Sequence, residues 1–145
     1  MWCHYNNSVD NEAIYGKLYN WFAVKLLQMD IDYYNAANPT TPWGWRVPNQ
    51  ADFNTLATTL GGASVAGGKM KIPGTLLNIA PNTNATNSSG LSIIGIGKRH
   101  EGGSFASGTI YNRGIDSTME ISNLETVGFG GTYNSLGGPL RLIKS

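Results

Sequence analysis

Glycine is distributed unevenly along this chain, which limits what each part can fold into. Only two of the 19 glycines precede residue 61, and the other seventeen lie from there onward. Glycine weakens helices and strands and favours tight turns. We therefore expect amphipathic helices in the first part and short strands between turns in the second. This pattern predicts an α+β fold, and 145 residues suit a single domain spanning residues 1–145.

Two helices are predicted before residue 61. The first should run from about Tyr15 to Gln28, because large apolar residues recur at helical spacing and would face a sheet. These residues are Tyr15, Leu18, Tyr19, Phe22 and Leu26. The second should follow Asn49, a strong N-cap, with Asp52 three residues on to complete the cap. It should end at the glycine pair 61–62.

The glycine-rich part is predicted to contain short strands joined by turns. We place the strands near residues 69–72, 92–96, 109–112, 125–129 and 140–143. Residues 81–90 form a polar loop, rich in side chains that hydrogen-bond their own backbone.

The charge balance excludes several classes of function. Lys and Arg number 10 and Asp and Glu number 9, so the formal net charge is +1. A broad basic surface for nucleic acid is therefore not expected. No apolar run is long enough to span a bilayer, and residues 1–6 lack signal-peptide features. We expect a soluble protein made in a cytoplasm, unless it is cut from a longer precursor.

The residues that usually carry catalysis are sparse. Cys3 is the single cysteine, which excludes an intrachain disulfide, and we interpret it as a small buried hydrophobic residue. His4 and His100 are the two histidines, and no nucleophile elbow lies near either. The glycine run at 62–67 lacks the lysine of a phosphate-binding loop. The run at 128–133 lacks the third glycine of a dinucleotide-binding fingerprint. The sequence therefore predicts no catalysis.

Three stretches, Tyr15–Val24, Gly44–Pro48 and Gly67–Lys71, resemble motifs of one known family, the Fibrobacter succinogenes major paralogous domain. Tyr15–Val24 is similar to its "YGxLYNWyAv" signature, and Gly44–Pro48 with the residues after it is similar to "GWhvPsdaeWntL". Gly67–Lys71 is similar to "GgKlK", and Gly138–Lys144 resembles its ending less closely. The usual N-terminal strand and a tryptophan-rich segment have no clear match. The domain is therefore expected to be truncated, or completed by a neighbour.

This resemblance implies a C-type-lectin-like fold, close to formylglycine-generating enzyme. It implies two helices beside a twisted, mostly antiparallel sheet, with long loops on one side, and places Trp21 and Trp45 in the core. Such an oxidase needs two cysteines for copper, so the single Cys3 argues against that activity. Calcium is the usual lectin cofactor. Asp30, Asp32 and Asn35 could supply oxygens, but no cofactor is the favoured expectation.

The candidate binding residues are Trp43 and two short groups in the glycine-rich second half of the chain. Tyr, Asn and Ser give contact area and hydrogen bonds at low ordering cost, and Trp43 is the more plausible exposed indole. The candidate ligand-binding residues are Trp43, Tyr111, Asn112, Arg113, Tyr133, Asn134 and Ser135. The alternative is that these residues form ordinary turns.

We therefore predict a non-catalytic binding or display domain. The favoured hypothesis is a bacteriophage virion surface protein, at a fibre tip, spike or capsid, that contacts a host-surface glycan or protein. Its expected partners are other virion proteins and further copies of itself, with a trimer as one form. One alternative is a capsid decoration or cement protein that binds no receptor. Another is an adhesion module of an exported bacterial protein, located outside the cell or on its surface.

Overall fold

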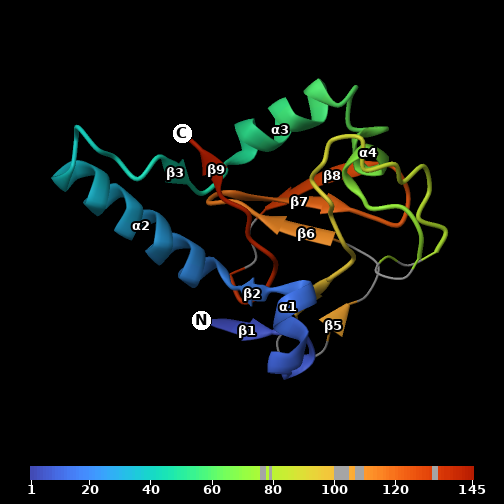
Figure 1. Ribbon diagram of the computed structural model, residues 1–145, viewed down its shortest axis with the longest axis horizontal. Helices are drawn as coiled ribbons and strands as arrows, with labels where there is room; N and C mark the ends of the chain where they lie inside the picture. Colours follow the sequence, from blue (N-terminus) through green and yellow to red (C-terminus); the bar gives the residue numbers. More distant parts are fainter. Residues whose placement is uncertain (76–77, 79, 100–104, 107–109, 132–133) are drawn as a thin grey trace.

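The computed structural model describes residues 1–75, 78, 80–99, 105–106, 110–131 and 134–145 (Figure 1). Its mixture of helices and antiparallel strands confirms the predicted α+β class. The helices are α1 (Glu12–Tyr15), α2 (Trp21–Ala37), α3 (Gln50–Thr59) and α4 (Ala66–Met70), with 3-10 turns η1 (Tyr5–Asn7) and η2 (Val9–Asn11). The strands are β1 (Trp2–His4), β2 (Lys17–Tyr19), β3 (Trp45–Arg46), β4 (Lys98–Arg99), β5 (Phe105–Ala106), β6 (Ile110–Arg113), β7 (Ser117–Ile121), β8 (Val127–Gly131) and β9 (Ile143–Lys144).

The described strands form four small antiparallel sheets instead of one continuous sheet. Three of them are two-stranded, β1–β2, β3–β9 and β4–β5, and the fourth has the order β6–β7–β8. Among the described residues, no helix combines the length and hydropathy that crossing a membrane requires.

Helix α3 forms where the sequence predicts it. Asn49 Oδ1 accepts from the Asp52 backbone N at 3.1 Å, and Asp52 Oδ2 accepts from the Asn49 backbone N at 2.8 Å. After the helix, Gly61 and Gly62 adopt φ angles of 97° and 102°, a conformation that only glycine takes without strain. The predicted capping box and the glycine stop are thus both confirmed.

The main hydrophobic core lies between α3 and α4 on one side and the β6–β7–β8 sheet on the other (Figure 1). Its buried members are Phe53, Ala57, Ala66, Met70, Ile93, Met119, Ile121 and Val127. Burying apolar area of this kind is the main favourable contribution to folding. The second predicted helix therefore covers the sheet with the expected apolar side.

The segment after α3 is helical, although residues 69–72 were expected to form a strand. Gly67 and Gly68 let α4 approach its neighbours, since a Cβ on Gly67 would lie 2.7 Å from the Glu125 carbonyl oxygen. A Cβ on Gly68 would lie 2.6 Å from the Asn84 carbonyl oxygen. Lys71 is buried, and its Nζ donates to the carbonyls of residues 122, 123 and 124. Gly67 and Lys71 therefore hold α4 against the turn before β8.

The first predicted helix is wrong in both its limits and its buried side. Gly16, at a φ of 67°, separates α1 from β2, so Leu18 is buried on a strand that pairs with β1. Helix α2 begins after Asn20, whose Oδ1 accepts from the Ala23 backbone N at 3.1 Å. It continues past Gln28 to Ala37, because no glycine or proline interrupts it before Pro39.

The strand predictions are correct mainly near β6 and β8. Residues 110–112 of the predicted strand 109–112 lie in β6, and residue 109 lies outside the described residues. Prediction 125–129 overlaps β8, but β7 was not predicted. Only Ile93 of 92–96 joins a bridge, to Lys71, and 140–143 is reduced to a bridge at Leu140 and the start of β9.

The last ten residues join parts of the chain that are far apart in sequence. Gly137 pairs with Arg99, Gly138 pairs with Tyr19, and β9 pairs with β3. The Ser145 backbone N also donates to the Gly44 carbonyl at 2.9 Å. Segment 136–145 therefore connects β2, β4 and β3, and its end lies between α2 and α3 (Figure 1).

Candidate functional site

A cleft of about 900 Å³ opens between α3, the β6–β7 strands, the β3 segment and the C-terminal residues. Its lining is largely apolar, which is typical of pockets that bind small ligands. The lining residues are Trp43, Trp45, Pro48, Asp52, Phe53, Thr55, Leu56, Thr59, Leu91, Ile93, Asn112, Arg113, Met119, Arg141, Leu142 and Ile143. Three predicted site residues, Trp43, Asn112 and Arg113, therefore meet at this cleft.

Two indoles stand at the cleft with large exposed areas. Trp43 is 46% exposed and Trp45 is 43% exposed. The Trp43 backbone N donates to Asn35 Oδ1 at 2.8 Å, which ties this segment to α2. The placement of Trp45 in the core is wrong, whereas Trp21 is partly buried and donates from Nε1 to the Ile115 carbonyl at 3.0 Å. Gly44 lies between them with a φ of 77°, so the chain turns at this point, and both indoles line the cleft.

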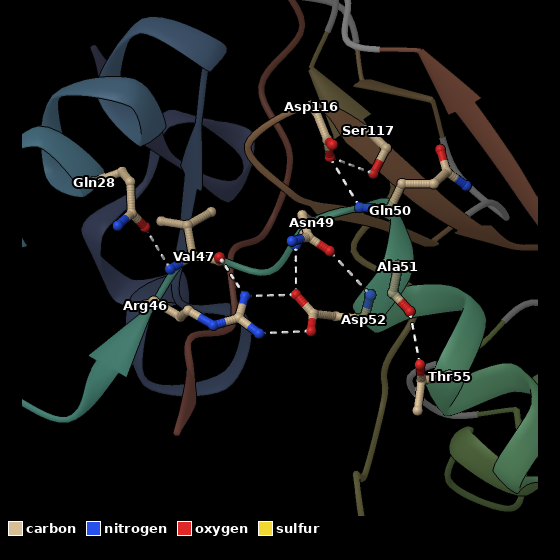
Figure 2. A network of polar contacts seen from close by, with 10 residues as sticks. All are labelled: Gln28, Arg46, Val47, Asn49, Gln50, Ala51, Asp52, Thr55, Asp116 and Ser117. Carbon is tan, nitrogen blue, oxygen red and sulfur yellow. Dashed lines mark hydrogen bonds and ion pairs between the residues drawn. The ribbon is translucent and has the colours of Figure 1, made fainter. Parts of the chain in front are cut away.

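A polar network holds the Trp45 strand between the two long helices (Figure 2). Arg46 Nη1 and Nη2 donate to the Asp52 carboxylate at 2.6 and 2.7 Å. The Val47 backbone N donates to Gln28 Oε1 at 2.8 Å, and the Gln50 backbone N donates to Asp116 Oδ1 at 2.9 Å. This network joins α2, β3, the start of α3 and the turn before β7.

The Arg46–Asp52 pair is the dominant electrostatic feature beside the cleft. The hydrogen bonds from Arg46, assisted by the Asn49 backbone N and the guanidinium charge, lower the pKa of Asp52 despite its partial burial. The same hydrogen bonds raise the pKa of Arg46. Both groups are therefore charged at neutral pH, and the carboxylate oxygens are directed at Arg46 instead of a ligand (Figure 2).

Asn112 places an unpaired amide in the apolar wall of the cleft. It lies on β6 opposite Met119, so both side chains share one side of the sheet, and it is only 4% exposed. Within the described part of the chain, its Nδ2 has no hydrogen-bond partner. A buried amide donor without a partner costs free energy, about 1–3 kcal/mol. This donor is shielded from solvent, so it contacts a ligand in the cleft only after the Asn112 side chain moves.

The two arginines near the cleft have different surroundings. Arg113 is buried, and its Nη2 donates to the Leu136 carbonyl while its backbone N donates to the Pro139 carbonyl at 2.9 Å. It therefore holds the C-terminal segment against β6. Arg141 is exposed as a whole residue, but the protein around its guanidinium removes water and lowers its pKa. Arg141 supplies a cation to the cleft lining that sequence reasoning missed.

Of the described side chains, those of Asn134 and Ser135 do not line the cleft. Tyr111 lies in β6 opposite Glu120, and Tyr133 lies outside the described residues. Asn134 and Ser135 are exposed in a turn, where the Asn134 carbonyl accepts from the Trp21 backbone N at 3.4 Å.

The proposed calcium ligands lie on α2 instead of in a loop. Asp32 accepts from Gln28 Nε2 at 2.7 Å, and Asn35 Oδ1 accepts from the Trp43 backbone N. Residues two apart on a helix point to different sides, so Asp30 and Asp32 do not converge. Across the described ranges, no group of three or more His, Cys, Asp or Glu residues could hold a metal ion.

The two residues weighed for thiol and imidazole chemistry lie together on β1. Cys3 is a free thiol and is partly buried, not fully buried as expected. His4 Nδ1 lies 3.3 Å from the Glu12 carboxylate, and its ring contacts Trp2 edge-on. His100 lies outside the described residues.

The fold and the cleft define an α+β domain built around short antiparallel sheets. Residues 1–115 match the family described as the Fibrobacter succinogenes major domain, and the chain belongs to this family. No curated protein and no solved structure matches the chain. The matched residues include Trp43, Trp45 and Asn112, while the C-terminal wall of the cleft lies beyond them.

Proposed function

We propose that the chain is a non-catalytic binding domain with a C-type-lectin-like fold, and that its cleft binds a surface glycan. The observation that carries the proposal is the meeting in one cleft of two exposed indoles and a buried amide whose Nδ2 has no partner among the described residues. A sugar ring presents C–H groups on its faces and hydroxyls around its edge. The Trp43 and Trp45 rings can stack on the C–H groups of a sugar face. Asn112 Nδ2 can donate a hydrogen bond to a hydroxyl oxygen at the edge of the sugar.

The size and charge of the cleft agree with this ligand class. Its volume of about 900 Å³ lies in the range of small-molecule sites and accommodates a short oligosaccharide. Arg141 adds a cation at the cleft, which favours sugars that carry a carboxylate, sulfate or phosphate. A protein ligand that inserts an apolar side chain between the indoles is the alternative within the same proposal.

We place this binding domain at the surface of a bacteriophage virion, among other virion proteins and facing a host-surface glycan or protein. A low content of charged residues, 13%, and glycine-rich turns support a display role over an electrostatic one. The second location that we consider is the surface of a bacterial cell or the space outside it.

The test is a glycan array followed by calorimetric titration of the strongest ligand. We expect Trp45→Ala and Trp43→Ala each to weaken binding by about tenfold or more, since each removes a stacking surface. Trp2→Ala is the matched control, because Trp2 is also half-exposed, at 49%, and does not line this cleft. Equal losses in all three variants, or no bound glycan at all, would overturn the proposal.

The structural alternative, a decoration protein that grips a shell, has its own supporting observation. Leu124 and Phe129, near and on β8, are 49% and 36% exposed and do not line the cleft. A Leu124→Glu and Phe129→Glu double variant should lose attachment to a capsid if this alternative holds. If the double variant still attaches to the capsid and the protein binds a glycan, the decoration alternative is contradicted and the cleft is the functional site.

A further inference from the structure

Helix α2 carries a stripe of large apolar residues, each of which stays more than half exposed in the described structure. Phe22, Leu26, Met29 and Tyr33 are 54%, 59%, 55% and 80% exposed. Their spacing of four, three and four residues aligns them on one side of the helix. Scattered exposed apolar residues are normal, but a line of four large ones on one helix is a contiguous patch of the kind that marks an interface.

The same helix buries a second apolar side against its own domain. Val24 and Ile31 are 0% and 4% exposed, and their helical positions lie opposite the stripe. A helix that is apolar on both sides is normally buried on both sides. The exposed stripe therefore indicates an unoccupied contact, while the buried side accounts for the packing of α2 in the single chain.

The charges beside the stripe are complementary to those of a second copy. In coiled-coil terms, Lys25 and Asp32 occupy positions that flank the stripe on one edge, and Asp30 flanks it on the other. In two helices related by a two-fold axis, Lys25 comes beside Asp32 of the partner subunit when the helices are antiparallel. It comes beside Asp30 of the partner subunit when they are parallel. Among the described residues, none of the three takes part in an ion pair.

We propose that α2 binds α2 of a second copy of this chain along the Phe22–Tyr33 stripe. The stripe is self-complementary, because its spacing reads the same in both directions along the helix. The two stripes together would bury roughly 800 Å², which is small for a protein interface. We therefore expect a reversible dimer with a dissociation constant of about 10–100 µM. This inference does not rest on ligand binding in the cleft.

The first test is sedimentation of the full chain over a concentration series. The wild type should change from monomer to dimer, and Leu26→Glu should weaken the dimer at least tenfold by placing a carboxylate in the apolar contact. Val9→Glu is the matched control, since Val9 is also exposed, at 65%, and lies away from α2. Circular dichroism should show both variants folded, because both positions are exposed in the single chain.

Reversing the charges beside the stripe distinguishes a specific dimer from non-specific hydrophobic association. Lys25→Asp should weaken the dimer at low salt, and adding Asp32→Lys or Asp30→Lys should restore it. Rescue by Asp32→Lys identifies antiparallel helices and rescue by Asp30→Lys identifies parallel ones. A wild type that stays monomeric up to about 1 mM, or dimers unaffected by Leu26→Glu, would overturn the proposal. Failure of both rescues would do the same.

Discussion

Asn112 is the residue at which stability and ligand recognition oppose each other. Its Nδ2 is buried without a partner in the described structure, beside Met119 in an apolar wall. Asn112→Leu should keep or raise the unfolding free energy, by up to about 1 kcal/mol, because it removes an unpaired donor. The same change should lower ligand affinity about tenfold. Chemical denaturation and calorimetric titration measure the two effects.

The matched control for that prediction is Met119→Leu, an apolar exchange on the neighbouring strand of the same cleft wall. It should change the unfolding free energy by less than about 1.5 kcal/mol. The ligand affinity should stay within about twofold of the wild-type value. A loss of more than about 1 kcal/mol of stability in Asn112→Leu would show that the amide has a structural role instead.

Asp52 should make the stability of the protein depend on acid pH. Its folded pKa is lowered, first by the hydrogen bonds from Arg46, so the unfolded chain binds the proton more tightly. The stabilisation is therefore present above the unfolded value of about 3.9 and is lost as pH falls through the folded pKa. Asp52→Asn should lower the unfolding free energy by about 0.5–1 kcal/mol at neutral pH, because the Arg46 pair is partly exposed to solvent. This difference should shrink below about pH 4.

Thermal melting between acid and neutral pH tests this expectation. Asp10→Asn is the control, because Asp10 is exposed and receives only a long contact of 3.5 Å from the Ser8 hydroxyl. A gap between wild type and Asp52→Asn that persists unchanged into strong acid would contradict the assigned role of the Arg46 pair.

At the scale of elements, the close approach of α4 to the turn before β8 sets a strict steric limit. A Cβ on Gly67 would lie 2.7 Å from the Glu125 carbonyl oxygen and 2.8 Å from Ile121 Cγ2. Gly67→Ala should therefore cost about 1–3 kcal/mol, more than the gain from alanine in a helix. Gly128→Ala, with nothing within 4 Å, should be tolerated. Similar melting temperatures for the two variants would refute this packing.

The elements that sequence reasoning located are those with local signals. Helix α3 has a side-chain cap at Asn49 and a glycine stop at Gly61, and both act within a few residues. The predicted first helix is wrong because its apolar spacing runs across Gly16, whereas α2 begins after its N-cap Asn20. Phe22 and Leu26 do lie at helical spacing on α2, as predicted, but they face solvent instead of a sheet.

At the scale of the whole molecule, segment 136–145 is expected to control the integrity of the cleft. Ile143 and Leu142 line the cleft, and β9 is the partner of β3, which carries Trp45. Removal of residues 142–145 should increase amide hydrogen exchange at Trp45 and Arg46 and weaken ligand binding, because β3 loses its strand partner. Exchange in α3 should change little. Unchanged exchange at β3 would contradict the prediction.

The site could be predicted only in part, because its walls come from distant segments. Trp43, Asn112 and Arg113 were chosen by residue type and do meet at the cleft. Trp45 was missed because its exposure depends on how β3 pairs with β9, which lies about two thirds of the chain length away in sequence. Arg141 was missed because no local pattern relates it to α3.

The pairing of the C-terminal segment also bears on how the protein is made. Residues 136–145 leave the ribosome after β2, β3 and β4, the elements that they join. Helix α3 and its cap can form early, since their contacts are local, whereas β3 must wait for a partner from the other end of the chain. During synthesis Trp45 therefore lies on an unpaired strand until residues 143 and 144 have been made, and the cleft is completed only at that point.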